Sequence, residues 1–248
     1  ICMRAVETLM KEVDRGQDFL NIMAGNVCTY MGALQLAESG AKIIRVGVGG
    51  GSVCKTRIVT GHGVPQLTAI EDCAQIKEDY DDVTIVADGG IRNSGDIVKA
   101  LAAGADAAMI GGLLAGTEET PGKVVDYDAM PKWFPSYDRI EDGLKHQSTW
   151  WEFRSGKWKK FAGMASEEGR KFNGWFTDED AFFIPEGEAI DVLYKGPVKN
   201  VIDNLVGGLR VGMSYAGAMS IKELQENAEW VRITHAGIIE GQPHGVKK

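Results

Sequence analysis

A cysteine lies in a glycine-rich stretch of a kind that can bind a ligand through its backbone. Residues 45–66 read RVGVGGGSVCKTRIVTGHGVPQ, so that Cys54 follows three consecutive glycines and Ser52. Glycines lack a Cβ atom, and several in a row let backbone N–H and carbonyl groups surround a ligand closely. A cysteine beside such a loop suits nucleophilic catalysis, in which the sulfur forms a covalent intermediate. A flexible hinge followed by a structural cysteine is the alternative, and the glycine run alone leaves both open.

Two further glycine-rich turns offer the same backbone groups. Asp88, Gly89 and Gly90 follow one apolar run of the sequence, and Gly111 and Gly112 follow another. Backbone N–H groups without a neighbouring Cβ atom are a common solution for binding phosphate. An ionised Asp88 can only accept hydrogen bonds, which suits the hydroxyl groups of a ribose. An aspartate before two glycines is also an ordinary turn former, so this motif alone does not establish a site.

These turns close apolar runs that alternate with helical patterns. Apolar β-branched runs favour strands, whereas apolar residues spaced three and four apart favour helices. The expected strands are residues 19–23, 42–48, 83–87 and 107–110. The expected helices are residues 3–13, 29–39, 67–80 and 95–103, the last with Ser94 as its cap and Asp96 in its first turn. Strands alternating with helices predict a parallel sheet of βα units, whose carboxyl ends bring the three turns together.

The second half of the sequence changes character. Residues 116–160 are aromatic, charged and irregular, and Trp133, Trp150, Trp151 and Trp158 are expected to form a local hydrophobic cluster rather than a base-stacking platform. Residues 161–186 are polar, lack a clear periodicity and are expected to form a mobile lid. Helical patterns return at residues 194–209 and 221–232, and Gly207, Gly208 and Gly217 are expected to split them.

We therefore expect an α/β fold in three parts. Residues 1–115 supply four βα units, residues 116–192 an insertion and lid, and residues 193–248 C-terminal helices and a tail. A closed barrel needs eight such units, so the four are either one half of a barrel or a small doubly wound sheet. The first residue is Ile1 rather than methionine, which is typical of a sequence that starts inside a longer chain.

Composition narrows the classes of function. The formal net charge of −8 argues against a general nucleic-acid binder, which needs a basic face. No apolar run approaches the roughly 20 residues of a membrane helix, and no leader of the secretory type is visible. The four cysteines include no closely spaced pair, so we expect reduced thiols in a cytoplasmic protein rather than disulfides or a zinc site.

The central stretch closely resembles the active-site loop of the IMP dehydrogenase/GMP reductase family, whose pattern is G-[IV]-G-x-G-S-[IV]-C-x-T-R. The resemblance extends over nearly the whole chain and implies the C-terminal half of a (βα)8 TIM barrel, with a Trp-rich excursion and a mobile lid. It implies an enzyme of purine metabolism that acts at purine C2 of a purine 5′-monophosphate, with NADPH or NAD as cofactor. A potassium ion and a homotetramer are also implied.

The resemblance also carries roles to individual residues. Cys54 is the expected nucleophile, Thr56 and Glu186 are expected to move a proton, and Asp88 is expected to hold the ribose. Asn26 is the expected cofactor contact. The phosphate-binding positions are Ser52, Gly89, Gly90, Gly111, Gly112, Gly163, Met164 and Ser166. The potassium-binding carbonyls are those of Gly49, Gly51 and Cys54, completed by residues 240–242 of a neighbouring subunit.

The two branches of the family differ in the lid. Dehydrogenases hydrolyse the covalent intermediate with the help of an Arg-Tyr pair, whose place here is occupied by Gly174 and Trp175, with Arg170 nearby. Neither Gly174 nor Trp175 can act as a base, and their presence at this place favours GMP reductase. Residues 58–61, residues 117–122 and the tail look more like IMP dehydrogenase, which stays the alternative. A nucleotide-binding module without catalysis is the alternative of another class.

Overall fold

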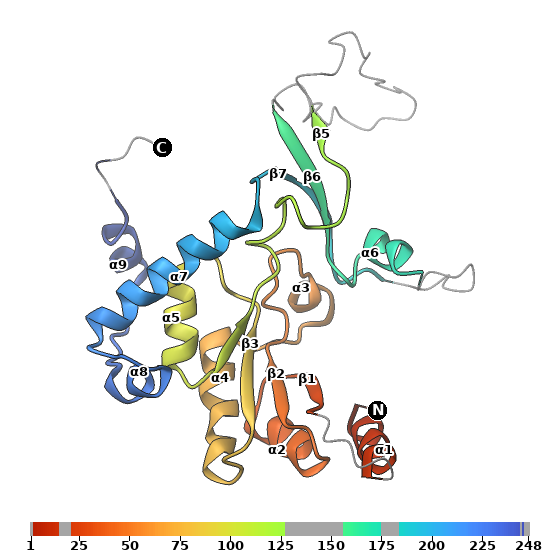
Figure 1. The fold of residues 1–248 in the computed structure, drawn as a ribbon, viewed down its shortest axis with the longest axis vertical. Coiled ribbons are helices and arrows are strands. Elements are labelled where there is room, and N and C mark those ends of the chain that lie inside the picture. The colour runs from red at the N-terminus through yellow and green to blue at the C-terminus, as the bar shows by residue number, and fades with distance from the viewer. Residues whose placement is uncertain (1, 15–20, 127–155, 175–183, 244, 246–248) are drawn as a thin grey trace.

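The chain is described from a computed structural model over residues 2–14, 21–126, 156–174, 184–243 and 245. Its centre is a sheet of four parallel strands in the order β1-β2-β3-β4. The strands are β1 (Met23–Val27), β2 (Ile43–Val46), β3 (Thr84–Asp88) and β4 (Ala107–Met109). Helices α2 (Tyr30–Glu38), α4 (Gln66–Ala74) and α5 (Ser94–Ala102) alternate with them, and a 3-10 turn, η1 (Gln75–Glu78), extends α4. The predicted parallel sheet of βα units is confirmed (Figure 1).

The core lies between this sheet and its helices. Ile44 and Val46 of β2 and Ile85 and Ala87 of β3 are completely buried, as the continuous apolar runs of these strands predict. The paired strands bring Ile44 opposite Ile85 and Val46 opposite Ala87. Burial of such side chains stabilises the fold by about 1.5–3 kcal/mol each.

The first strand lies four residues later than predicted. The expected strand, residues 19–23, overlaps with β1 only at Met23, and residues 24–27, which follow the expected strand, belong to β1. The reason is a close approach between backbones, because a Cβ atom on Gly25 would overlap the carbonyl group of Arg45 in the neighbouring strand. The glycine therefore permits strand pairing here rather than a turn.

The start of α5 also differs by one residue from its prediction. Asn93, not Ser94, is the cap, and its side chain accepts a hydrogen bond from the backbone N–H of Asp96 at 3.0 Å. Ser94 is instead the first residue of the helix. Asp96 lies in the first turn as predicted, where its negative charge interacts favourably with the positive end of the helix dipole.

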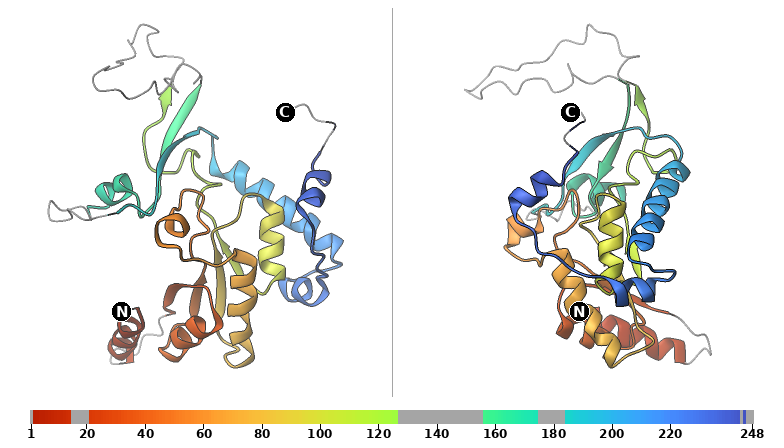
Figure 2. Two further views of the ribbon diagram at one scale, coloured as in Figure 1. Left: turned by 180° about the vertical axis from the view of Figure 1, so that it is seen from behind. Right: turned by 90° about the vertical axis from the view of Figure 1, so that its left-hand side faces the viewer.

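A second, antiparallel sheet rises beyond the end of the parallel sheet (Figures 1 and 2). It consists of β5 (Val125–Asp126), β6 (Lys157–Ala162) and β7 (Ala189–Leu193), with β6 in the middle. Helix α6 (Glu167–Phe172) follows β6, so the expected lid is partly regular structure: residues 161–162 end a strand and residues 167–172 form a helix. Of the four tryptophans, Trp158 lies in β6 and the other three lie outside the described residues.

Helix α7 (Val198–Tyr215) is continuous, contrary to the expected interruption at Gly207 and Gly208. A Cβ atom on Gly208 would overlap the side chain of Ser94, and one on Gly212 would lie 2.5 Å from a methyl group of Val98. These glycines therefore let α7 pack closely on α5 rather than break the helix.

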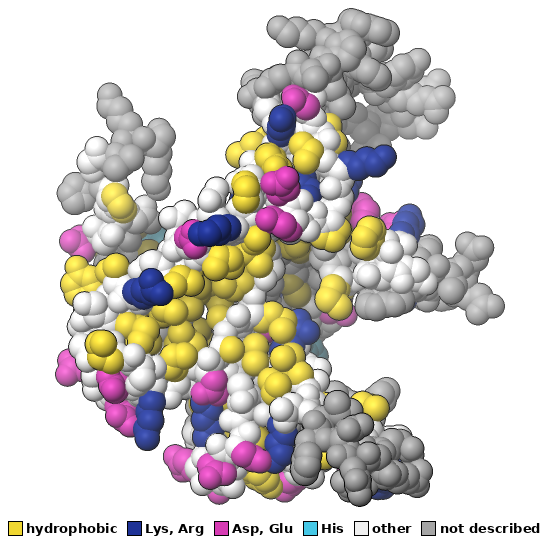
Figure 3. Space-filling view, viewed as in Figure 1, with side chains coloured by type: hydrophobic (Ala, Val, Ile, Leu, Met, Phe, Trp, Pro, Cys, Tyr) yellow, Lys and Arg dark blue, Asp and Glu magenta, His cyan; other side chains and the backbone are white. Residues whose placement is uncertain are grey.

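Three further helices lie towards the two ends of the chain. Helix α1 (Cys2–Asp14) confirms the predicted first helix, whereas α8 (Ile221–Asn227) is shorter than predicted and α9 (His235–Glu240) lies in the tail. Figure 3 shows hydrophobic side chains gathered over α5 and α7, and Val211 and Tyr215 of α7 are exposed. Within the described ranges, no helix combines the length and apolar character needed to cross a membrane.

Candidate functional site

A cavity of about 300 Å³ opens where the parallel strands end at their carboxyl side. This is the edge of a βα sheet at which ligands bind. Its lining includes predicted catalytic, substrate-binding, cofactor-binding and potassium-binding residues. These lining residues are Asn26, Gly49, Gly51, Ser52, Cys54, Asp88, Gly89, Gly90, Gly111, Gly112, Gly163, Met164 and Glu186. Thr56 and Ser166 do not line the cavity and contact residues that do.

Two glycine turns form the floor of the cavity by packing backbone against backbone. The N–H group of Gly90 donates to the carbonyl oxygen of Gly50 at 2.7 Å. A Cβ atom on Gly89 would lie 2.9 Å from the carbonyl carbon of Gly50, and one on Gly47 would overlap the carbonyl oxygen of Asp88. The two turns touch so closely that a side chain would not fit, and this contact requires glycine. It also places the Cys54 loop against the Asp88 turn.

We expect Gly47→Ala to destabilise the protein by at least about 3 kcal/mol. Gly47 has a φ of +141°, and the added methyl group would overlap Asp88. Gly61→Ala is the matched control, because Gly61 has a φ of +71° but open space around it, so that only about 1 kcal/mol of backbone strain is expected. Urea unfolding of both variants measures the difference, and equal losses would contradict the packing argument.

A short three-stranded arrangement holds the cysteine against the end of the lid. The N–H of Lys55 donates to the carbonyl oxygen of Glu186 at 2.6 Å, and the N–H of Glu188 donates to that of Val53 at 2.9 Å. Residues 186–188 also pair with the loop after β6, since the N–H of Gly163 donates to the carbonyl oxygen of Glu188 at 2.9 Å. Residues 186–188 thus lie between the nucleophile loop and the predicted phosphate loop, and they fix the distance between the two.

This pairing places three predicted catalytic side chains in one hydrogen-bonded chain. The Cys54 thiol donates to the Thr56 hydroxyl, with 3.1 Å from sulfur to oxygen. The Thr56 hydroxyl donates in turn to Oε2 of Glu186 at 2.7 Å. Thr56 is the first residue of a short helix that the sequence did not predict, α3 (Thr56–Thr60), which directs its side chain back towards Cys54. The arrangement can carry a proton between the sulfur and a carboxylate.

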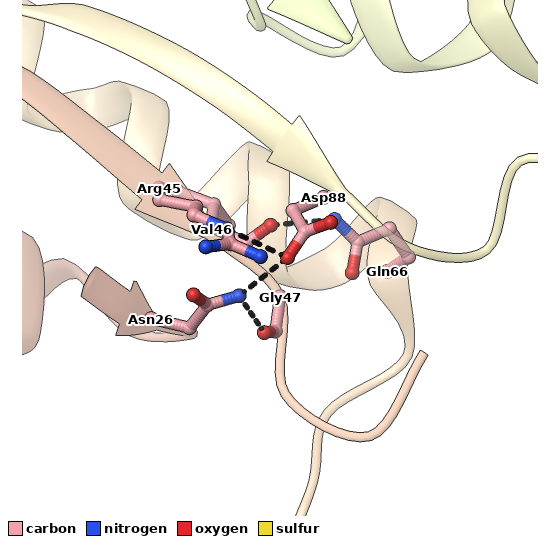
Figure 4. A network of polar contacts seen from close by, with 6 residues as sticks. All are labelled: Asn26, Arg45, Val46, Gly47, Gln66 and Asp88. Atoms are coloured by element: carbon pink, nitrogen blue, oxygen red, sulfur yellow. Dashed lines mark hydrogen bonds and ion pairs between the residues drawn. The ribbon is translucent and has the colours of Figure 1, made fainter. Parts of the chain in front are cut away.

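A second polar network lies at the ends of β1, β2 and β3 (Figure 4). One carboxylate oxygen of Asp88 accepts from Nε of Arg45 at 2.9 Å and from the side-chain amide of Asn26 at 2.8 Å. The Asn26 amide also donates to the carbonyl oxygen of Gly47 at 2.6 Å. Within the described chain, these contacts leave the second Asp88 oxygen for a hydroxyl group of a ligand, and they attach Asn26 to Asp88, the predicted ribose-binding residue.

Arg45 and Gln66 are site residues that the sequence analysis missed. Gln66 is the first residue of α4 and donates from its side-chain amide to the carbonyl oxygen of Val46 at 2.8 Å, at the end of β2 (Figure 4). A charged residue inside an otherwise apolar strand was the available signal for Arg45, because such a residue needs a partner. Nothing in the sequence distinguished Gln66 from an ordinary helix residue.

Two of the predicted phosphate positions, Ser52 and Gly112, meet at the cavity, whereas the N–H of Gly90 is taken by the carbonyl oxygen of Gly50 and is not open to a ligand. A Cβ atom on Gly112 would lie 2.6 Å from the hydroxyl oxygen of Ser52, so the ends of two different strands meet there. In the described part of the chain, the backbone N–H groups of Ser52, Gly111, Gly112 and Met164 have no acceptor. Free N–H groups that converge in this way suit an anion.

Ser166 has a different position from the other predicted phosphate residues. Its hydroxyl is buried, accepts from the N–H of Gly169 at 2.9 Å and donates to the carbonyl oxygen of Gly163 at 2.6 Å. It caps α6 and closes the loop that carries Met164. A direct contact of Ser166 with phosphate stays a prediction.

The cysteines differ sharply in environment. Cys54 lies at the cavity, whereas Cys73 of α4 is completely buried in the core. Burial, followed by the nearby Asp72 carboxylate, raises the pKa of the Cys73 thiol to about 12. Cys28 packs against the same core.

We expect Cys73 to resist alkylation by iodoacetamide at pH 8, because the thiolate is the reacting form and a pKa of about 12 leaves almost none of it. Cys54 is expected to react at least about tenfold faster in the folded protein. Mass spectrometry of labelled peptides over time measures both rates. Equal labelling of the two cysteines in folded protein would contradict the assigned environments.

The residues present fit the cofactors implied by the resemblance. Asn26 lines the cavity and its side-chain oxygen has no donor in the described chain, so it could accept from the carboxamide or a hydroxyl of a nicotinamide cofactor. The carbonyl groups of Gly49, Gly51 and Cys54 lie in one loop, and oxygen donors suit a potassium ion. The described part of the chain holds no cluster of three or more acidic, histidine or cysteine side chains for a metal.

Residues 2–134 and 147–244 match the family described as the IMP dehydrogenase / GMP reductase domain. An inosine-5′-monophosphate dehydrogenase of Aquifex aeolicus is 44% identical over 248 residues, which cover 98% of this chain and 45% of that relative. The corresponding protein of Methanocaldococcus jannaschii is 40% identical over 259 residues, covering 98% of this chain and 46% of that relative. The chain thus spans about half the length of the curated relatives it matches.

A solved structure is similar over the same extent. It is a GMP reductase from Trypanosoma brucei, a cysteine-to-alanine variant in complex with guanosine 5′-monophosphate, with a TM-score of 0.80 and 38% identity. The match covers 99% of this chain and 45% of that one. The predicted fold class, a partial TIM barrel, is confirmed.

Proposed function

Because the chain belongs to the IMP dehydrogenase/GMP reductase family, we propose that it carries the active site of a purine nucleotide oxidoreductase acting at purine C2, most specifically a GMP reductase. The observation that carries the proposal is the hydrogen-bonded chain from Cys54 through Thr56 to Glu186. It joins a nucleophile to a proton carrier at the mouth of a cavity with an anion site and a ribose site. A substrate with an electron-poor ring carbon, a ribose and a phosphate fits these three features.

The first chemical step forms a bond between sulfur and carbon. The Cys54 thiol passes its proton through Thr56 to Glu186, and the thiolate adds to C2 of GMP. The 2-amino group then needs a proton to leave as ammonia, and the same Thr56–Glu186 pair returns one to it. Loss of ammonia leaves C2 bonded to Cys54 as a thioimidate.

The second step reduces that intermediate. C2 receives the hydride that a bound reduced nicotinamide supplies, the carbon–sulfur bond breaks, and the thiolate leaves with IMP as the product. The balance is GMP, NADPH and two protons giving IMP, NADP⁺ and ammonium. Asn26 is the residue we assign to hold the cofactor, with NADPH or NAD as the candidates. The carbonyl groups of Gly49, Gly51 and Cys54 are the ones we assign to hold a potassium ion, which would keep the nucleophile loop in shape.

IMP dehydrogenase is the second candidate. It is favoured by the relatives from Aquifex aeolicus and Methanocaldococcus jannaschii, whose names give that activity. In that reaction the hydride leaves C2 of IMP for NAD⁺ and water hydrolyses the thioimidate. The reductase is favoured by the Trypanosoma brucei protein, a GMP reductase in complex with GMP, and by Gly174 at the place of the expected water-activating pair. The second residue of that place, Trp175, lies outside the described residues.

The test mixes the full-length protein with GMP and NADPH and, separately, with IMP and NAD⁺, and follows the absorbance of the reduced nicotinamide. Loss of absorbance with GMP supports the reductase, and a gain with IMP overturns it in favour of the dehydrogenase. Nucleotide binding without turnover in either mixture would leave the nucleotide-binding module without catalysis. We further propose a homotetramer in the cytoplasm, which sedimentation and fractionation measure.

A further inference from the structure

Lys159 in β6 is a buried lysine whose charge no carboxylate balances in the described part of the chain. Its residue surface is 3% exposed. Its Nζ atom donates to the carbonyl oxygens of Thr117 at 3.0 Å, Glu118 at 3.3 Å and Thr120. These three acceptors match the three N–H donors of a lysine ammonium group. Burying a charge is costly, and an apolar side chain of similar length would fill this space without that cost.

The ammonium group joins two limbs of the candidate site. One limb runs from Gly111, whose carbonyl oxygen accepts from Leu114 at 3.0 Å, into a second turn in which Thr117 donates to Leu114 at 3.1 Å. The three carbonyl groups that hold Lys159 extend this limb. The hydrogen-bonded turns make it one rigid unit from the Gly111 turn to the ammonium group.

The other limb is β6 itself. It continues past Lys159 to Ala162 and directly into the loop of Gly163 and Met164, whose backbone lines the cavity. Lys159 therefore connects β6, which leads into the predicted phosphate loop of Gly163 and Met164, with the turns that follow Gly111, another predicted phosphate position. Its backbone pairs with Val192 of the antiparallel neighbour β7, so the attachment is anchored on both sides.

The cavity offers little positive charge of its own. Among the lining residues that the structure describes, Arg45 is the only lysine or arginine, and its guanidinium is paired with Asp88. Asp88 and Glu186 add negative charge. A phosphate dianion would bind to neutral N–H groups here, and a positive charge in the scaffold that joins them would favour it.

We infer that Lys159 is a positioning residue for phosphate recognition: it fixes the spacing of the two limbs and gives their scaffold a positive charge. The inference rests on the proposed function, because it assumes a purine 5′-monophosphate as the ligand. It assigns Lys159 to the affinity for the phosphate group rather than to the chemistry at Cys54.

The test compares GMP with guanosine, which lacks the phosphate. In the full-length protein, Lys159→Met is expected to weaken GMP binding by about tenfold or more, while guanosine affinity and kcat change by less than about threefold. Lys160→Met is the matched control, because Lys160 is the exposed neighbour in the same strand. Thr117→Val is a second control, since the buried Thr117 hydroxyl has no partner in the described chain and its removal leaves the carbonyl contact intact.

Isothermal titration with each ligand measures the ratio of the two affinities. An equal loss for GMP and guanosine, or no loss for either, would overturn the inference and leave Lys159 as a structural residue. Should Lys159→Met fail to fold, Lys159→Gln removes the charge, keeps an N–H donor and carries the same comparison. A wild-type protein that binds no GMP would instead overturn the proposed function, which separates the two failures.

Discussion

Replacing Cys54 by alanine is expected to lower turnover of GMP by at least about 10⁴-fold and to leave nucleotide binding within a few-fold of wild type. The sulfur is the atom that must bond to C2, and no other cysteine in the described part of the chain lines the cavity. The phosphate and ribose contacts do not involve the thiol, so the cavity keeps its ligand. Initial rates with GMP and NADPH, together with titration of GMP in the absence of cofactor, measure the two effects.

Cys28→Ala is the matched control for this loss. Cys28 is a half-buried cysteine that packs against the core and lies outside the cavity. We expect its removal to change turnover by less than about threefold, although it deletes the same sulfur atom. Residual activity of Cys54→Ala above about one hundredth of wild type would mean that no covalent step through this sulfur is needed. The Thr56–Glu186 pair would then have to act on the substrate alone.

The parallel sheet could be predicted because its strands read as short apolar runs between helical patterns. The first strand was misplaced because glycine normally marks a turn, and only the contact between Gly25 and Arg45 shows that it permits strand pairing. The same reason explains α7, where Gly208 and Gly212 are small to admit α5. In each case a glycine had two physical explanations, and a residue distant in sequence decided between them.

The candidate site was predictable wherever a local pattern carries the chemistry. Cys54 and the glycine turns can be identified from residue type and spacing, and the topology of a βα sheet brings them to one edge. The network around Asp88 was not predictable, because Arg45 and Gln66 act through partners on other strands. Lys159 was hidden for a different reason: in sequence it is one of three lysines in a polar strand, and only its burial sets it apart.

The carboxylate at the end of the hydrogen-bonded chain gives the second large effect. Glu186→Gln is expected to lower kcat with GMP by about 10²–10⁴-fold, because an amide cannot take a proton from Thr56 or return one to the departing nitrogen. The side chain keeps its size and its backbone pairing with Lys55, so GMP affinity should change by less than about threefold. Steady-state rates over a range of pH and titration of GMP measure the two effects.

Glu188→Gln is the matched control, since it makes the same change two residues away on an exposed side chain that pairs with Lys55. An exposed ion pair of this kind contributes little, so a change of less than about threefold is expected. If both variants lost activity equally, the effect would come from a disturbed backbone at residues 186–188 rather than from proton transfer. Thr56→Val separates these cases further, because it interrupts the path between Cys54 and Glu186 without touching that backbone. A loss in Thr56→Val comparable to that in Glu186→Gln, with Glu188→Gln unaffected, would identify the hydroxyl and the carboxylate as one path for the proton.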